Sequence, residues 1–347
     1  MDNNTYTKTI VVDAYGGDNP KEIIKGCVLA LNSKNVNEDF NIIITGKQDE
    51  IDSELSNYKY DKSKLEVINT TEVITCNDVP TVAIKTKKDS SLVVAFNLLK
   101  KREDIVAMVS AGSTGAILTG GFLLIGRIKG VSRPALSPLL PTLNDGKGTL
   151  LIDCGANMDC KPINLCHFAL MGSEYMKALG IENPKVALLS VGTEDEKGND
   201  LIKKTLPLLK KLPINFVGNM EARDLLTGNY DVVVSDGFSG NVALKSLESG
   251  ITSMNKLIKR EIKARPLSIF GSLFMKKSFK AVKQKIDYES NGGSPFIGCK
   301  KLIMKCHGAA ESESVCNTIL SALNLSNLNL NDKIEKIVNE NEIIVEE

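Results

Sequence analysis

A short loop of small residues is the first candidate for chemistry in this chain. It spans residues 110–115, between an apolar run at 105–109 that predicts a buried strand and one at 116–125 that is typical of a buried helix. Its central residues combine backbone freedom with hydroxyl donors: Gly112, Ser113, Thr114 and Gly115. Because the first amides of a helix lack partners and carry partial positive charge, the loop suits phosphate or another anion. A plain strand-to-helix turn with a Ser or Thr cap explains the same pattern.

Loops of the same kind follow other apolar runs, at residues 9–12, 149–152, 185–191, 231–235 and 300–305. The unit of predicted strand, small polar loop and predicted helix recurs at least six times along the chain. This alternation indicates an α/β protein with a mainly parallel sheet and helices on both faces. In such sheets a ligand lies beyond the carboxyl ends of the strands, so loops that are distant in sequence can share one crevice.

Length and composition narrow the class of protein. With 347 residues, 42% of them hydrophobic and 24% charged, the chain fits one large globular domain or two intimately joined subdomains. A net charge of +1 gives no global field that would attract nucleic acid. We find neither an apolar run long enough to span a membrane nor a signal peptide, which favours a cytoplasmic protein.

The eight cysteines show no CxxC pair. The densest grouping of metal-binding residue types matches no common zinc spacing, and it consists of Cys154, Cys160, Cys166 and His167. We therefore expect reduced structural thiols and no bound metal.

A basic segment with large apolar side chains stands apart from this pattern. Residues 255–285 hold ten Lys or Arg and a single acid, Glu261, and we expect a basic amphipathic helical segment over 255–292, inserted in a single catalytic domain over 1–347. Such a segment favours an interfacial membrane helix or a surface for an acidic partner, and a dimer interface explains it as well. The side chains expected to dock are Phe270, Leu273, Phe274, Lys276 and Lys277.

Several of these loops together resemble the bacterial phosphate acyltransferase family (PlsX). The resemblance covers nearly the whole chain in family order, and it rests on VDAYGGD at 12–18, KDSS at 88–91, SAGSTG at 110–115, RPAL at 133–136, DCGANMDCKP at 153–162, GNMEARD at 218–224, SDGFSGNVALK at 235–245 and KCHG at 305–308. Tyr15 stands where the family usually has Met, and Ser113 where it usually has Asn. A more distant similarity to phosphotransacetylases implies a three-layer α/β/α fold like that of isocitrate and isopropylmalate dehydrogenases.

The resemblance implies a reaction and its partners. Long-chain acyl-ACP (acyl carrier protein) and inorganic phosphate would give acyl-phosphate and free ACP, which feeds phosphatidic acid and phospholipid synthesis. It further implies a homodimer at the membrane periphery, near a membrane-embedded glycerol-3-phosphate acyltransferase that uses the product. The resemblance implies no cofactor. Phosphate is itself a competent nucleophile near neutral pH, so the reaction requires no covalent protein nucleophile.

Three polar side chains are candidates for catalysis of this reaction. Lys197 would neutralise phosphate or the oxyanion, Asn241 would donate to either, and His307 would protonate the departing thiolate. Residues 112–115 would cradle the phosphate. A solvated loop lysine, a helix cap and a strand-end histidine are the corresponding structural explanations for Lys197, Asn241 and His307.

Other functions are compatible with parts of the sequence. A short-chain phosphotransacetylase that uses coenzyme A fits the loops, but it gives no reason for the basic apolar segment. A non-catalytic scaffold leaves the polar residues at the strand ends unexplained. A nicotinamide-dependent dehydrogenase shares the expected fold, yet the chain has no GxGxxG that opens a βαβ unit.

Overall fold

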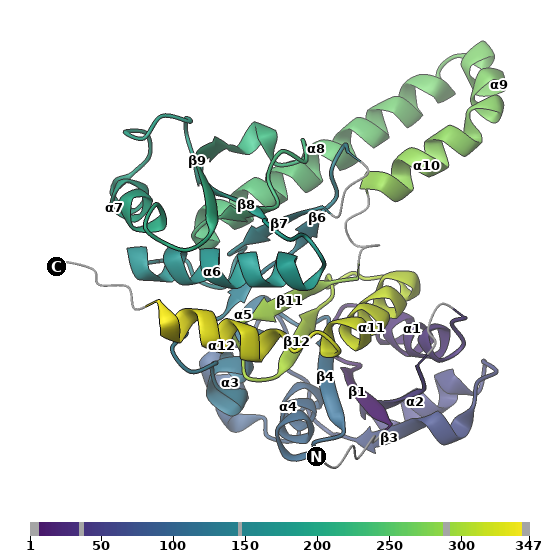
Figure 1. Cartoon of the computed structure of the whole chain (residues 1–347). Helices are drawn as coiled ribbons and strands as arrows, with labels where there is room; N and C mark the ends of the chain where they lie inside the picture. Colours follow the sequence, from purple (N-terminus) through teal and green to yellow (C-terminus); the bar gives the residue numbers. More distant parts are fainter. Residues whose placement is uncertain (1–6, 35–37, 145–147, 287–291, 342–347) are drawn as a thin grey trace.

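The computed structural model describes residues 7–34, 38–144, 148–286 and 292–341. The strands in these ranges form two sheets, each with its own helices (Figure 1). The α/β architecture with mostly parallel strands is therefore confirmed, and the strands are divided between two sheets.

The larger sheet has seven strands, in the order β3 (Leu65–Asn69), β2 (Phe40–Gly46), β1 (Lys8–Asp13), β4 (Ile105–Ser110), β12 (Leu302–Lys305), β11 (Ser294–Ile297) and β5 (Ala135–Leu136). Strands β3 to β12 in this order run parallel, while β11 is antiparallel to both of its neighbours. The central strands are buried on both faces, which explains why they appear in the sequence as continuous apolar runs.

The smaller sheet has five strands, in the order β6 (Leu139–Leu140), β7 (Thr149–Ile152), β10 (Val232–Val234), β8 (Lys185–Ser190) and β9 (Asn215–Glu221). All of its pairs are parallel except β6 with β7. Only two residues, Ser137 and Pro138, separate β5 from β6, so the chain passes directly from one sheet to the other. The two sheets are thus connected through their edge strands β5 and β6.

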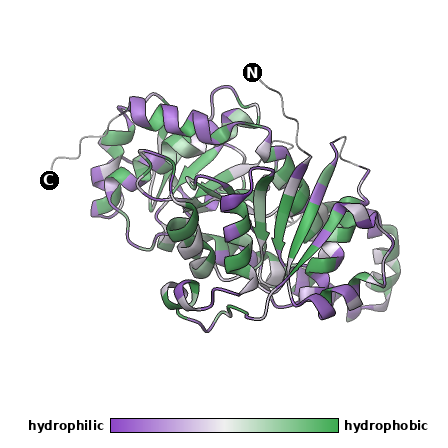
Figure 2. Ribbon diagram, turned by 90° about the horizontal axis from the view of Figure 1, so that it is seen from below, coloured by the Kyte–Doolittle hydropathy of each residue, from purple (hydrophilic) through white to green (hydrophobic). Residues whose placement is uncertain are grey.

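Helices cover the faces of both sheets. They are α1 (Pro20–Leu31), α2 (Gln48–Leu55), α3 (Pro80–Thr86), α4 (Ser91–Lys101), α5 (Thr114–Gly120), α6 (Pro162–Ala178), α7 (Asp200–Leu209), α8 (Gly237–Lys263), α11 (Ser312–Ser326) and α12 (Leu330–Glu340). The C-terminal helix α12 packs against α6 of the other lobe, which joins the two halves a second time (Figure 1). Figure 2 shows the hydrophobic strands enclosed by helices whose outer faces are hydrophilic.

A helical arm leaves the body of the molecule. Helix α8 continues beyond the smaller sheet and is followed by α9 (Pro266–Phe274) and α10 (Lys276–Ile286), which fold back beside it (Figure 1). This arm corresponds to the predicted segment 255–292, of which residues 287–291 lie outside the described ranges. None of the described helices combines the length and the apolar character needed to cross a lipid bilayer.

Candidate active site

Three neighbouring strands of the larger sheet end in polar residues at the same level. Asp13 of β1 and Lys305 of β12 are both paired in register with Ser110 of β4. Because the three strands are parallel, their following loops leave the same edge of the sheet. The loops of residues 14–19, 111–113 and 306–311 are therefore brought together, as the sequence predicts.

A buried hydrogen-bond chain fixes two of these loops. Ser110 Oγ donates to Asp13 Oδ2 at 2.7 Å and accepts from the Gly112 amide at 3.0 Å. Burial raises the pKa of Asp13, although hydrogen bonds to the carboxylate lower it in part. A side chain at Gly16 would place its Cβ 2.4 Å from Asp13 Oδ2 and 2.8 Å from the Gly112 nitrogen, so only glycine fits there. Asp13 thus has a structural role in holding the loop that starts α5.

Asp153 has the corresponding role after β7, and it also connects the two sheets. Its Oδ1 accepts from the amides of Leu136 in β5 and Cys154 at 2.9 and 2.7 Å, and its Oδ2 accepts from the Asn157 amide at 2.6 Å. Burial raises the pKa of Asp153 to about 6, because the loss of solvation outweighs these hydrogen bonds.

The start of α8 packs tightly on this loop. Asp236 caps the helix by accepting from the Ser239 amide at 2.8 Å. A Cβ on Gly240 would lie 2.0 Å from the Asp153 carbonyl oxygen, so the helix can approach only with glycine at this position. This close contact places Asn241 against Gly155, whose positive φ of +107° favours glycine.

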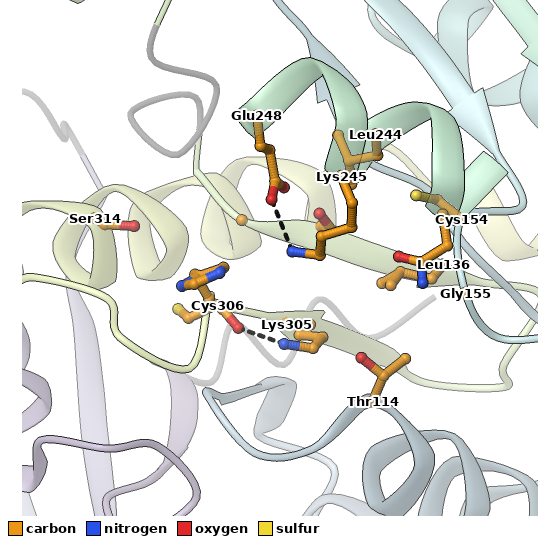
Figure 3. A pocket seen from close by; sticks show the side chains of 14 residues that line it. Thr114, Leu136, Cys154, Gly155, Leu244, Lys245, Glu248, Lys305, Cys306 and Ser314 are labelled. Carbon is orange, nitrogen blue, oxygen red and sulfur yellow. Dashed lines mark hydrogen bonds and ion pairs between the residues drawn. The ribbon is translucent and has the colours of Figure 1, made fainter. Parts of the chain in front are cut away.

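A pocket of about 210 Å³ lies between the two sheets, where these loops meet. Figure 3 shows side chains from α8 on one side and from β12 and α5 on the other. Among the lining residues are three that the sequence singled out, Thr114, Asn241 and His307. Residues from 114 to 314 in the chain contribute to it, which is the convergence expected at the carboxyl ends of parallel strands.

Two lysines that no sequence pattern singled out also line the pocket. Lys245 Nζ lies 2.8 Å from Glu248 Oε2, and Lys305 Nζ donates to the Cys306 carbonyl oxygen at 2.8 Å. Lys245 comes four residues after Asn241 on α8, a spacing that puts both side chains on the same helix face. This spacing is visible in the sequence and could have identified Lys245. Lys305 is the last residue of a strand that ends in the crevice.

The loop of residues 110–115 contributes to the pocket through Thr114. Ser113 instead caps α5, where its Oγ accepts from the Ala116 amide at 3.2 Å, and the Gly112 amide is bonded to Ser110. A Cβ on Gly115 would lie 3.0 Å from Pro80, so this glycine packs against α3. The amides of Thr114 and Gly115 are the first of the helix and have no acceptor within it.

Lys197 lies outside this pocket. It is exposed in the loop after β8, and its neighbours Gly198 and Asn199 line a different, mostly apolar groove of about 630 Å³. That groove is bordered by Phe238, Val242 and other residues of α8 that do not line the pocket of Asn241. The structure therefore brings together Thr114, Asn241 and His307, and it does not bring Lys197 to them within one chain.

The cysteines are present as thiols, and five of the eight are buried. Burial raises the pKa of Cys154, which lines the pocket, so little thiolate is present there. In the described ranges no group of three or more His, Cys, Asp or Glu side chains is placed to hold a metal ion.

His167 is a buried structural histidine that does not line the pocket, and its Nδ1 accepts from the Ser132 amide at 3.1 Å.

The arm exposes the apolar side chains predicted to dock. Phe270, Leu273 and Phe274 are 64, 66 and 79% exposed, and the two phenylalanine rings meet edge to face at 5.5 Å. Lys276 and Lys277 follow directly at the start of α10. The side chains thus form an exposed apolar tip, with basic residues beside it.

Comparison with known proteins places these features in a family. Residues 8–333 match the model of a family described as fatty acid synthesis protein. A phosphate acyltransferase of Clostridioides difficile (strain 630) is 45% identical over 319 residues, which cover 91% of this chain and 92% of that protein. A phosphate acyltransferase of Thermoanaerobacterium thermosaccharolyticum is 44% identical over 329 residues, which cover 94% and 96%.

Solved structures agree at the level of the fold. A phosphotransacetylase from Streptococcus pyogenes superimposes with a TM-score of 0.60 at 16% identity, over 92% of this chain and 94% of that one. A 4-hydroxythreonine-4-phosphate dehydrogenase from Klebsiella pneumoniae gives a TM-score of 0.53 at 13% identity, over 92% and 100%. At such identities the likeness concerns the fold alone.

Proposed function

The chain belongs to the phosphate acyltransferase family and is thus an acyltransferase, and from this premise we propose that its acyl donor is a long-chain acyl-ACP. In the proposed reaction a phosphate oxygen attacks the thioester carbonyl carbon. The carbon–sulfur bond then breaks, the ACP thiol takes up a proton, and acyl-phosphate is released. The product would feed phospholipid synthesis.

The observation that carries this proposal is the meeting of Thr114, Asn241 and His307 in one pocket between the two sheets. In the proposed mechanism the Asn241 side-chain amide donates to the phosphate or to the tetrahedral oxyanion, and His307 protonates the departing sulfur. The first amides of α5, next to Thr114, face the phosphate. These groups are positioned before the reaction, so they stabilise developing charge without reorganisation.

Direct attack by phosphate needs no covalent acyl-enzyme. Phosphate is an anionic nucleophile near neutral pH, whereas the Cys154 thiol in the pocket is kept protonated by its raised pKa. A test is possible without any variant: acyl exchange between palmitoyl-ACP and free labelled ACP should not occur in the absence of phosphate. Exchange without phosphate would indicate an acyl-enzyme and contradict this part of the proposal.

The predicted catalytic role of Lys197 is not supported by its position, because Lys197 lies outside the pocket. It follows from the family resemblance, while Lys197 itself lies near the apolar groove that Phe238 and Val242 border. The variant Lys197→Ala separates the two possibilities. A decrease of kcat by about a hundredfold or more would show that Lys197, and with it the groove, takes part in the reaction. A rate close to that of the wild type would show that Lys197 is a solvated loop residue.

The arm supports a proposed peripheral membrane location. Long-chain acyl-phosphate is amphiphilic, and an exposed apolar tip beside lysines suits the surface of an anionic bilayer. We propose that Phe270, Leu273 and Phe274 insert among the lipids while Lys276 and Lys277 meet the headgroups. Membrane association would deliver the product to a membrane-embedded glycerol-3-phosphate acyltransferase.

A homodimer is also proposed, on the family resemblance. Light scattering coupled to size-exclusion chromatography should give twice the 37.6 kDa mass of one chain. A monomer at micromolar concentration would contradict it.

The donor is tested by measuring phosphate-dependent thiol release from palmitoyl-ACP, palmitoyl-CoA and acetyl-CoA in parallel. The proposal predicts release from palmitoyl-ACP. Release from acetyl-CoA alone would instead favour a phosphotransacetylase, the activity of the Streptococcus pyogenes structure that shares the fold.

A further inference from the structure

Two lysine side chains enter the pocket from opposite sides, one from a helix and one from a strand. Lys305 ends β12 of the larger sheet, and Lys245 lies on α8, which follows β10 of the smaller sheet. Figure 3 shows both side chains directed into the pocket, with Thr114 facing them from α5. Two positive charges are thereby brought into a space of about 210 Å³.

Lys305 is a mostly buried cation with unused donors. An ammonium group has three N–H donors, and in the described part of the chain that of Lys305 makes one hydrogen bond, to the Cys306 carbonyl. Burial lowers the pKa of Lys305, and the charge of Lys245 contributes to the decrease. An anion placed between the two lysines would remove the repulsion and supply the missing acceptors.

Lys245 is held differently. Its side chain is 55% exposed and pairs with Glu248, one helical turn further along α8. Exposed pairs of this kind are weak, so Lys245 can leave Glu248 for a stronger anionic partner at small cost. Glu248 keeps the lysine at the mouth of the pocket and also places a negative charge beside it.

We propose that Lys305 and Lys245 together bind the phosphate substrate, with Lys305 as the fixed cation and Lys245 as the one that turns from Glu248 to the ligand. The inference rests on the proposed function, of which it specifies the phosphate site. Since Lys305 ends a strand of the larger sheet and Lys245 lies on the helix that follows the smaller sheet, bound phosphate connects the parts of the molecule built on the two sheets. In the reaction the same two charges offset the repulsion between phosphate and the oxyanion that forms on the thioester carbon.

Calorimetric titration of the whole protein with inorganic phosphate, without acyl donor, tests the site directly. We expect Lys305→Met to weaken phosphate binding by about ten- to a hundredfold, as for loss of a charged hydrogen-bond donor, and Lys305→Arg to restore part of the affinity. Lys245→Met should weaken binding less, and Glu248→Gln should strengthen it. The matched control is Lys300→Met, an exposed lysine near the opposite end of β12, which should bind like the wild type.

Kinetics with palmitoyl-ACP separate this inference from the proposed function. The Lys305 and Lys245 variants should raise the KM for phosphate and leave the KM for acyl-ACP unchanged. If the wild type transfers acyl groups while folded Lys305→Met binds phosphate normally, the inference is wrong and the function stands. If no donor reacts but Lys305→Met still loses phosphate binding, the function is wrong and the site stands. Should Lys305→Met fail to fold, unchanged phosphate affinity in Lys245→Met overturns the inference.

Discussion

Asn241 and His307 reach the pocket on different elements, and this difference allows their roles to be separated. Asn241 sits near the start of a helix that is fixed by Asp153 and Gly240, whereas His307 is exposed in the loop after β12. A donor on a fixed helix suits the developing oxyanion, and an exposed histidine suits proton transfer to a departing thiolate.

Replacement of Asn241 by alanine should therefore lower kcat by about a hundred- to a thousandfold, the effect of losing one oxyanion donor. Replacement of His307 by asparagine should lower kcat by about a hundredfold, with the KM for phosphate unchanged. Initial rates with palmitoyl-ACP measure both effects, and calorimetric unfolding midpoints check that each variant is folded. A kcat close to that of the wild type in folded Asn241→Ala would show that Asn241 has no role in catalysis and is only a polar residue near the start of α8.

His167 predicts a pH dependence of stability that is independent of the site. Burial lowers its pKa from 6.5 to about 4, because the charged ring would lose its solvation there. The unfolded state then binds more protons than the folded one between these pH values, so stability falls as pH decreases through this window. The free energy of unfolding of the wild type relative to His167→Gln should fall by about 3 kcal/mol from pH 7 to pH 4.

Denaturant unfolding of the two proteins at several pH values measures this difference. The raised pKa of Asp153 acts in the opposite direction, but it is common to both proteins and cancels in the comparison. A difference that does not vary with pH would mean that His167 titrates normally when folded.

At the residue scale the sequence located much of the pocket. Thr114, Asn241 and His307 were identified because each follows a predicted strand, where parallel sheets place their ligands. Lys245 and Lys305 were not identified, since a lysine in a helix or at a strand end is ordinary in sequence. The two lysines become candidates only because the fold brings them into one pocket, and a local sequence pattern holds no information about that contact.

The elements around the site depend on close backbone contacts. Gly240 lets α8 meet the Asp153 carbonyl, while a Cβ on Gly250 in the same helix would have no neighbouring atom within 4 Å. The same substitution should therefore have opposite effects on stability at two positions of one helix.

We expect Gly240→Ala to lower the free energy of unfolding by about 1–3 kcal/mol and to weaken phosphate binding, because the helix must shift. Gly250→Ala, the matched control, should raise it by about 0.5–1 kcal/mol, because alanine favours the helix. Thermal or denaturant unfolding measures both changes. Equal effects of the two substitutions would show that the contact at Gly240 does not constrain α8.

The elements themselves were mostly evident in the sequence. The strong apolar runs at 9–12, 105–109 and 149–152 predicted β1, β4 and β7 within a residue. Strand β11 was not predicted, because it is short and contains Pro295. Helix α12 was not predicted, because most of its residues are polar or charged and only a few apolar ones, such as Ile334 and Val338, are buried.

At the scale of the whole molecule, the arm carries the proposed link to lipid. Its tip lies far from the pocket along α8 (Figure 1), so changes there should affect membrane binding without affecting chemistry. Burial of each large side chain contributes about 1.5–3 kcal/mol, and each nearby lysine about 1 kcal/mol on an anionic surface.

The double variant Phe270→Glu/Phe274→Glu should lose co-sedimentation with anionic lipid vesicles and retain full activity on soluble acyl-ACP. The double variant Leu143→Glu/Val217→Glu, at exposed apolar positions elsewhere, should sediment like the wild type. Vesicles without anionic lipid, or high salt, should weaken wild-type binding in part. Unchanged co-sedimentation of the Phe270/Phe274 variant would rule out lipid insertion by the tip.

The central claim is that phosphate attacks the acyl thioester in the pocket between the two sheets. Its most direct test is mass spectrometry of the products formed from palmitoyl-ACP and phosphate labelled with heavy oxygen. The account predicts palmitoyl-phosphate that keeps every labelled oxygen, formed in equal amount with free ACP thiol and lost in Asn241→Ala. Release of unlabelled fatty acid, or no release of thiol from palmitoyl-ACP, would contradict it.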